Sequence, residues 1–268
     1  MRFVQFGCGN MGGAMLAGWL AGGFAPEDFT VIDPYLAAAP AGVRHVSALP
    51  ADEPAADVVL LGFKPQQLPD ARAAVSGAIG RDTLVLSILA GVDLATLRAT
   101  FPQAGAIVRV MPNLAAALGK SPIALFGDAT GAAHDLTARL MAPLGEAHWL
   151  EAESAMDLVT ALAGSGPAFV YRVIDALAGA AAGLGLPRDQ ADRLALAMVE
   201  GSALLAAQSP HSPGELARRV ASPGGVTQKG LDVLDADDRL ARLMTDTLRA
   251  ARDRSAEMTA EAIARLKG

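Results

Sequence analysis

The sequence predicts an N-terminal α/β domain of the Rossmann-like type, with a mostly parallel sheet, followed by an all-α C-terminal domain. Three observations support this fold class. Short apolar, β-branched runs alternate with helical stretches in the first half; a glycine-rich turn joins the first run to the first helix; and such runs are absent after Trp149. We expect the two domains to span residues 1–151 and 152–268.

The elements follow one another regularly along the chain. The expected strands are residues 2–6, 30–33, 58–63, 83–89, 106–111 and 123–126, and the helices between them include residues 12–22, 65–79 and 93–99. In the second half, Ala- and Leu-rich patterns predict helices over residues 155–183, 188–208, 214–220, 228–234 and 239–266. Strands that alternate with helices are typical of βαβ units, in which the strands run parallel.

Two stretches of the helical half, residues 168–183 and 194–207, are apolar on most faces. A helix at the surface of a monomer normally shows one apolar stripe. Either these stretches are central core helices, or they are buried against a second copy of the chain. Because residues 151–268 offer little material to cover them, we expect a homodimer or a larger symmetric homo-oligomer.

Composition limits the class of protein and of partner. The 268 residues are 52% hydrophobic and 19% charged, with a formal net charge of -6 and no block of like charges. This composition argues against binding to nucleic acid or to a membrane. A single cysteine, Cys8, and the lack of a signal-peptide pattern favour a cytoplasmic protein. The four histidines match no metal-ligand spacing, so no metal site is expected.

The stretch GCGNMG at residues 7–12 matches the pattern G-x-G-x-x-G. It follows the first predicted strand and opens a helix, and Asp33 ends the next strand. Such glycines permit a tight turn and let a pyrophosphate approach the amides of a helix N-terminus. A strand–helix turn without a ligand is the alternative. The context predicts a dinucleotide site with these cofactor contacts: Phe6, Gly7, Gly9, Asn10, Met11, Gly12 and Asp33.

Further strand ends are expected at the same crevice, because ligands of open α/β sheets bind at the carboxyl ends of strands. They are FKP at residues 63–65, SILAG at 87–91 and RVMPN at 109–113. For the lysine of FKP, an exposed loop residue is the alternative. The amide of the last asparagine is suited to bond a ligand amide. The expected contacts are Phe63, Lys64, Pro65, Ala90, Gly91 and Asn113.

The stretch SPGGVTQKG at residues 222–230 interrupts a helical pattern and then resumes it at Thr227. One explanation is a plain interhelical turn in which Ser222 and Thr227 cap a helix. The other is an anion cradle, because Gly224 and Gly225 let backbone N–H groups point into one concavity ahead of a helix N-terminus.

Together these stretches resemble the pyrroline-5-carboxylate reductase family. The matching segments occur in the family's order over nearly the whole chain: FGCGNMG (6–12), FKPQ (63–66), SILAGV (87–92), RVMPN (109–113), GSGPAF (164–169), PGEL (213–216) and SPGGVT (222–227). The sequence departs from the family's pattern at Ala163, at Leu114 and Ala115, and at Val226. None of these differences removes a group with an assigned chemical role.

The resemblance implies hydride transfer from NAD(P)H to the C=N bond of 1-pyrroline-5-carboxylate, the last step of proline synthesis. It implies that Thr227 is the catalytic residue, with its hydroxyl at the ring nitrogen. It also implies that Glu153 lies near the substrate, for which a solvated glutamate is the alternative. The substrate-binding residues that it implies are Ser222, Gly224, Gly225, Val226, Thr227 and Glu153.

We expect NADH to be used at least as well as NADPH. The carboxylate of Asp33 suits the ribose hydroxyls of NADH and repels a 2′-phosphate. A nearby Arg or Lys normally offsets that phosphate in NADP-binding loops, and residues 34–43 contain neither; the first basic candidate is Arg44.

Two other functions remain open. One is a related imine reductase or hydroxyacid dehydrogenase acting on another small acid. The helix after GSG reads PAFVYRVIDALAGA and lacks the Lys and Asn that β-hydroxyacid dehydrogenases carry there, which disfavours an alcohol substrate. The other is an NAD(P)-binding regulatory protein without catalysis, against which the intact SPGGVT segment argues.

Overall fold

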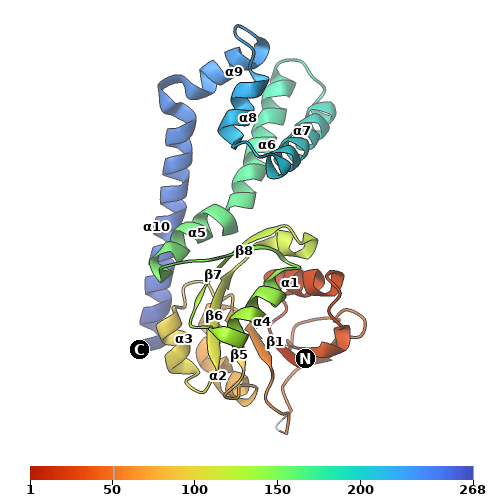
Figure 1. The fold of residues 1–268 in the computed structure, drawn as a ribbon, viewed down its shortest axis with the longest axis vertical. Coiled ribbons are helices and arrows are strands. Elements are labelled where there is room, and N and C mark those ends of the chain that lie inside the picture. The colour runs from red at the N-terminus through yellow and green to blue at the C-terminus, as the bar shows by residue number, and fades with distance from the viewer. Residues whose placement is uncertain (51, 268) are drawn as a thin grey trace. The chain divides into compact units, whose positions relative to one another are not determined.

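The computed structural model describes residues 1–50 and 52–267, and Figure 1 shows the arrangement of its elements. The described chain divides into two compact units. The first contains residues 1–164 together with the chain from Ala251 onward, and the second is Ser165–Ala250.

A mostly parallel sheet forms the centre of the first unit. In the described residues it has eight strands in the order β3-β2-β1-β4-β5-β6-β7-β8. Neighbouring strands are parallel except for β6 and β7, which are antiparallel. The bounds are β1 Phe3–Phe6, β2 Phe29–Ile32, β3 Arg44–Val46, β4 Val58–Leu61, β5 Leu84–Ser87, β6 Ala106–Met111, β7 Ser121–Gly127 and β8 Gly145–Trp149. The predicted Rossmann-like fold class is confirmed.

Helices cover both faces of the sheet. Successive β1 residues point to opposite faces: Phe3 packs with residues of α1 (Asn10–Ala21) and α4 (Gly131–Met141), and Val4 with residues of α2 (Leu68–Gly77) and α3 (Leu94–Thr100). Short helical turns connect these elements: η1 Pro26–Asp28, η2 Pro65–Gln67, η3 Leu114–Leu118 and η4 Glu153–Ala155. Burial on both faces explains why β1, β2, β4 and β5 are largely apolar, with Gln5, Thr30 and Ser87 as their buried polar residues.

The chain leaves the first unit through α5 (Met156–Val159) and a π-helical turn, Thr160–Gly164. The sequence predicts one continuous helix over residues 155–183. The structure divides it, because Pro167 has no N–H to donate and stands in the first turn of the next helix, α6.

The second unit is helical throughout its described residues. It contains α6 (Gly166–Gly183), α7 (Arg188–Gln208), α8 (Pro213–Val220), α9 (Val226–Asp235), the turn η6 (Ala236–Asp238) and the first part of α10 (Arg239–Lys267). The buried core cluster found in this unit consists of Ala178, Ala191 and Ala195, while many larger apolar side chains of α6 and α7 are exposed. So small a core does not bury the apolar surface of these helices.

Three elements are absent from the sequence prediction. The strand β3 is short, and its Arg44 and His45 are exposed. The strand β8, GEAHW, is exposed over three of its residues, and α4 begins GAAHD, without an apolar residue larger than alanine in its first turn. The apolar pattern that marks a buried strand or an amphipathic helix is therefore weak in all three.

The predicted domain boundary at residues 151 and 152 follows the last strand, β8. The compact units divide instead after Gly164, because the segment from Glu153 to Gly164 packs on the first unit and α10 returns to that unit at Ala251. The positions of the motifs predict a dinucleotide-binding domain at residues 1–151 and a substrate-binding and dimerisation domain at residues 152–268, and these roles stay predictions. No helix in the described part of the chain has both the length and the apolar character required to cross a membrane.

Candidate functional site

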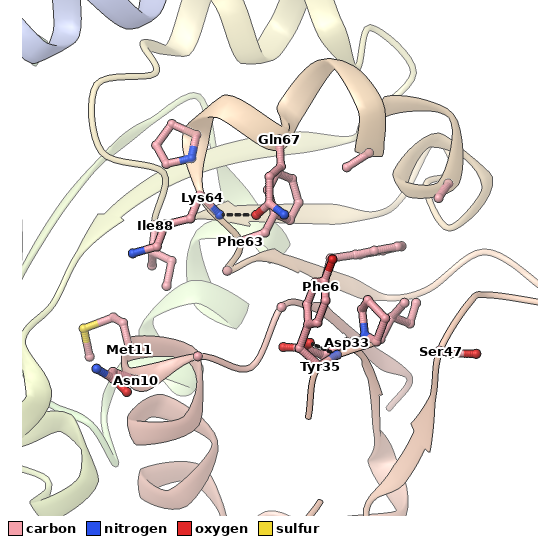
Figure 2. A pocket seen from close by; sticks show the side chains of 18 of the residues that line it. Phe6, Asn10, Met11, Asp33, Tyr35, Ser47, Phe63, Lys64, Gln67 and Ile88 are labelled. Atoms are coloured by element: carbon pink, nitrogen blue, oxygen red, sulfur yellow. Dashed lines mark hydrogen bonds between the residues drawn. The ribbon is translucent and has the colours of Figure 1, made fainter. Parts of the chain in front are cut away.

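A cleft of about 740 Å³ lies at the carboxyl ends of β1, β2, β4 and β5. Figure 2 shows Asp33, Tyr35 and Ser47 together at one end of this cleft, away from Met11 and Ile88. The cleft brings together ten of the predicted cofactor contacts: Phe6, Gly7, Gly9, Asn10, Met11, Asp33, Phe63, Lys64, Pro65 and Ala90.

Ile88, from the predicted stretch SILAG, also lines the cleft. The other lining residues are not predicted from the sequence: Ile32, Pro34, Tyr35, Ser47, Ala48, Leu49, Gly62, Gln67, Ala71, Ala74 and Leu114. Some of them are direct neighbours of predicted contacts, so the strand-end rule would have found them. Residues 47–49 follow β3. Because the sequence does not predict this strand, no predicted strand end pointed to these residues.

The glycines of the turn between β1 and α1 differ in how closely other atoms surround them. Gly7 has a φ of 86°, and a Cβ there would lie 2.7 Å from the backbone nitrogen of Phe63. A Cβ on Gly12 would lie 2.8 Å from the carbonyl oxygen of Gly7, whereas a Cβ on Gly9 would meet no atom within 4 Å. The turn is therefore packed tightly behind Gly7 and Gly12 and is open at Gly9.

The N-terminus of α1 is suited to an anion. Gly9 is its N-cap, and no side chain caps the helix there. Amides of the first turn of a helix have no partner within the helix and carry its positive dipole end. Since Gly9 lines the cleft and leaves space in front of these amides, the site fits a dinucleotide pyrophosphate.

The carboxylate of Asp33 is fixed at the end of β2. Its Oδ2 accepts a hydrogen bond from the backbone nitrogen of Cys8 at 2.7 Å, and its Oδ1 accepts one from that of Tyr35 at 2.9 Å. Arg44, the nearest basic residue along the chain, donates instead to Glu53 at 2.7 Å. The carboxylate is thus held in the cleft, and Arg44 is engaged elsewhere.

Cys8 lies between these groups, and its thiol is half-buried. Burial raises the pKa of the Cys8 thiol, and the negative charge of Asp33 raises it further. The thiol therefore stays neutral at pH 7, as expected for a small packing residue.

The remaining predicted contacts in the first unit do not line the cleft. Besides Gly12, they are Gly91, against which α10 packs, and Asn113. The side-chain amide of Asn113 donates to the carbonyl of Ala163 and accepts from the nitrogen of Ala115, both at 2.9 Å. Because both ends of this amide are used within the chain, a ligand contact by Asn113 stays a prediction.

Glu153 is half-buried and is bonded to other residues of the chain. Its Oε1 accepts a hydrogen bond from Arg109 Nη1 at 2.6 Å and another from the backbone nitrogen of Leu94 at 2.7 Å. Arg109 lies within β6, and its side chain is buried. Neither of the two interpretations of Glu153 from sequence includes this ion pair, and a substrate contact by Glu153 stays a prediction.

The predicted substrate turn lies in the second unit. The nitrogen of Gly225 donates to the carbonyl of Ser222 at 2.9 Å, Gly224 has a φ of 72°, and α9 begins directly afterwards at Val226. Gly225 is the N-cap, and no side chain caps this helix. The plain capping role for Ser222 and Thr227 is therefore not realised. The first-turn residues Val226 and Thr227 are exposed.

Among the residues that the structure describes, no group of three or more His, Cys, Asp or Glu side chains is arranged to hold a metal ion.

Two family models match the chain. A model for pyrroline-5-carboxylate reductase dimerisation matches residues 153–258, and a model for coenzyme F420-dependent NADP oxidoreductases matches residues 3–91. The two matches therefore cover parts of both compact units.

Individual relatives match over nearly the whole chain. The pyrroline-5-carboxylate reductase of Pseudomonas aeruginosa is 35% identical over 264 residues, covering 96% of each protein. That of Methanosarcina acetivorans is 35% identical over 260 residues, covering 94% of this chain and 96% of the relative. The structure of a pyrroline-5-carboxylate reductase from Coxiella burnetii superposes with a TM-score of 0.87 at 28% identity, covering 96% of this chain and 98% of the other.

Proposed function

The chain belongs to the pyrroline-5-carboxylate reductase family, and we propose that it reduces the C=N bond of 1-pyrroline-5-carboxylate with NAD(P)H, giving L-proline. The observation that carries the proposal is the open glycine turn at the N-terminus of α1, which fits a dinucleotide in a chain whose relatives are reductases of this name.

The cofactor belongs in the cleft of the first unit. A bound NAD(P)H supplies the hydride for the reaction. The amides at Gly9 and the first turn of α1 hold the pyrophosphate, and Asp33 accepts hydrogen bonds from the adenosine ribose. The apolar side chains that line the cleft exclude water from the bound dinucleotide.

The substrate carboxylate belongs at the turn that precedes α9. The unpaired amides of the first turn of α9 bind it without a cationic side chain. Thr227, the second residue of this helix, places its hydroxyl at the ring nitrogen and stabilises the protonated imine and then the amine. Ser222 adds a further contact to the carboxylate.

NADH is used at least as well as NADPH. The support is the fixed Asp33 carboxylate, which meets ribose hydroxyls favourably and a 2′-phosphate unfavourably, together with the engagement of Arg44 by Glu53.

The active form is a homodimer or a larger symmetric assembly. The support is the match of residues 153–258 to the dimerisation model and the exposed apolar surface of the second unit. We assign the protein to the cytoplasm, as its single cysteine led us to expect.

The test is the oxidation of NADH and of NADPH, followed at 340 nm, with purified protein and 1-pyrroline-5-carboxylate. We expect turnover with formation of proline, and none with a panel of hydroxy acids. Tight binding of NAD(P)H without turnover of any imine would indicate instead a regulatory protein.

A further inference from the structure

The loop that follows β5 forms part of the wall of the cleft. Ile88 and Ala90 line the cleft, and the loop ends where α3 begins at Leu94. The position of this loop therefore affects the shape of the cleft, and it is held by side chains that lie far from it in the sequence.

One support acts at the end of the loop. The Oε1 atom of Glu153 accepts a hydrogen bond from the backbone nitrogen of Leu94 at 2.7 Å. The same atom forms an ion pair with Arg109 Nη1 at 2.6 Å. The first turn of α3 is thereby tied to β6, because Arg109 is a β6 residue and is buried.

The other support acts at the middle of the loop and comes from the last turns of α10. Gly91 has a φ of 77°, and a Cβ on it would lie 3.1 Å from the Cα of Thr259 and 3.3 Å from the carbonyl oxygen of Met258. The helix backbone and the loop backbone are thus in direct contact, and both this close approach and the positive φ favour glycine.

Asp157 fixes α10 at this contact. Its Oδ1 accepts hydrogen bonds from the hydroxyls of Ser255 at 2.7 Å and of Thr259 at 3.3 Å. The two hydroxyl residues are one helical turn apart and half-buried, so they share the inner face of α10. Figure 1 shows α5, which carries Asp157, beside these last turns of α10.

Charges on the outer face of this part of α10 are satisfied locally. Arg252 pairs with Asp253 at 2.5 Å, and Arg254 pairs with Glu257 at 2.8 Å. No ion pair of Asp157 occurs among the described residues, so its carboxylate is held by hydroxyls and acts as a hydrogen-bond acceptor.

We propose that Asp157, Ser255 and Thr259 are positioning residues for dinucleotide binding, which hold α10 against Gly91 and so fix the loop carrying Ile88 and Ala90 in the wall of the cleft. This inference rests on the proposed function, because it takes the cleft to be the NAD(P)H site. It gives the end of the chain a role in a site formed mainly by residues 6–90.

The test compares Asp157→Ala with Asp157→Asn in the full-length protein. Removing the acceptor raises the KM for NADH or NADPH by about fivefold to tenfold, the effect of one or two hydrogen bonds, while kcat at saturating cofactor changes less than twofold. Asp157→Asn keeps an acceptor oxygen and retains the wild-type KM. The double variant Ser255→Ala/Thr259→Val reproduces the effect of Asp157→Ala.

Hydrogen exchange of the peptide covering residues 88–94 gives a readout that is independent of activity. Exchange there is faster in Asp157→Ala than in the wild type. Thr137→Val is the matched control: its hydroxyl donates only within α4, to the carbonyl of Ala133 at 2.8 Å, and its loss leaves both KM and the exchange of this peptide unchanged.

The outcomes separate the two proposals. If the wild type binds neither NADH nor NADPH, the proposed function fails. If the wild type binds the cofactor and Asp157→Ala binds it equally well, the positioning role is wrong. Equal impairment of Asp157→Asn and Asp157→Ala also overturns it, because the charge rather than the hydrogen bond would then be required.

Discussion

Thr227 stands in the first turn of a helix that begins without a side-chain cap. The N-cap is Gly225, and the side chain of Thr227 is exposed, as the proposed contact with the substrate requires. The neighbouring Val226 is 93% exposed and carries no polar group, which leaves Thr227 to supply the side-chain hydroxyl in this turn of α9.

Thr227→Ala lowers kcat far more than it weakens cofactor binding. The loss of one directed hydrogen bond at the substrate nitrogen raises the barrier by roughly 1–3 kcal/mol, which is about tenfold to a hundredfold in rate. Steady-state kinetics with 1-pyrroline-5-carboxylate, together with a fluorescence titration of NADH, checks this. An unchanged kcat/KM in the variant would remove Thr227 from the mechanism.

Asp33 is the residue to which we assign the proposed use of NADH. Both carboxylate oxygens already accept a backbone hydrogen bond, from Cys8 and from Tyr35, and rotation of the side chain away from an incoming phosphate would break both bonds. Asp33→Ser removes the negative charge and keeps a hydrogen-bonding group.

We therefore expect Asp33→Ser to raise kcat/KM for NADPH relative to NADH by about tenfold, since relief of one charge repulsion is worth on the order of 1 kcal/mol or more. The measurement is kcat/KM for each cofactor at a fixed substrate concentration, in the wild type and the variant. If the wild type already prefers NADPH by tenfold or more, the electrostatic role assigned to Asp33 is wrong.

At the residue scale, the sequence predicted which residues line the cleft, but not the hydrogen-bond partners of Asn113 and Glu153. Motif spacing identified ten lining residues, because the carboxyl ends of parallel strands necessarily meet at one edge. It assigned ligand contacts to Asn113 and Glu153, whose polar atoms are bonded to Ala163 and Arg109. These partners lie 50 and 44 residues away, and pairings over such distances depend on the tertiary fold.

At the scale of elements, two adjacent glycines of α1 differ in the space that surrounds them. Gly12 and Gly13 are neighbours in the same helix. A Cβ on Gly12 would approach the Gly7 carbonyl oxygen and the Gln5 amide nitrogen to 2.8 Å, whereas a Cβ on Gly13 has 3.8 Å to its nearest neighbour. The first contact is too short for real atoms, and the second is ordinary van der Waals distance.

Gly12→Ala therefore destabilises the fold by about 1–3 kcal/mol and weakens NAD(P)H binding, because α1 must move away from the turn that holds the pyrophosphate. Gly13→Ala is the matched control, which stabilises α1 by up to about 1 kcal/mol through helix propensity. Urea denaturation and cofactor titration of both variants check the pair. Equal stability of the two variants would contradict the packing role of Gly12.

The elements that sequence analysis identified share a property that the missed ones lack. Strands β1, β2, β4 and β5 are buried at every position and therefore stand out as apolar runs. The edge strands β3 and β8 are largely exposed, so their pairing is decided by neighbouring backbone and not by an apolar pattern. The π-helical turn at Thr160–Gly164 lies within a stretch whose pattern predicts one continuous helix.

At the scale of the whole molecule, the second unit leaves many large apolar side chains exposed. Small alanines form its buried core cluster in the described residues, while leucines of α7 face outward. Leu194 and Leu205 are 60% and 71% exposed, and they are separated by about three helical turns, so they lie on one face. In the proposed homo-oligomer, a second copy of the chain buries this face, in agreement with the dimerisation model that matches residues 153–258.

The double variant Leu194→Glu/Leu205→Glu disrupts this assembly, because it puts charges where apolar side chains are to be buried. Light scattering at micromolar concentration shows a species of at least twice 27.3 kDa for the wild type and a smaller or aggregated one for the variant. Leu118→Glu, at a 78% exposed leucine of the first unit, is the control and leaves the assembly intact. A wild-type monomer of 27.3 kDa that retains full activity would show that the exposed face has another use.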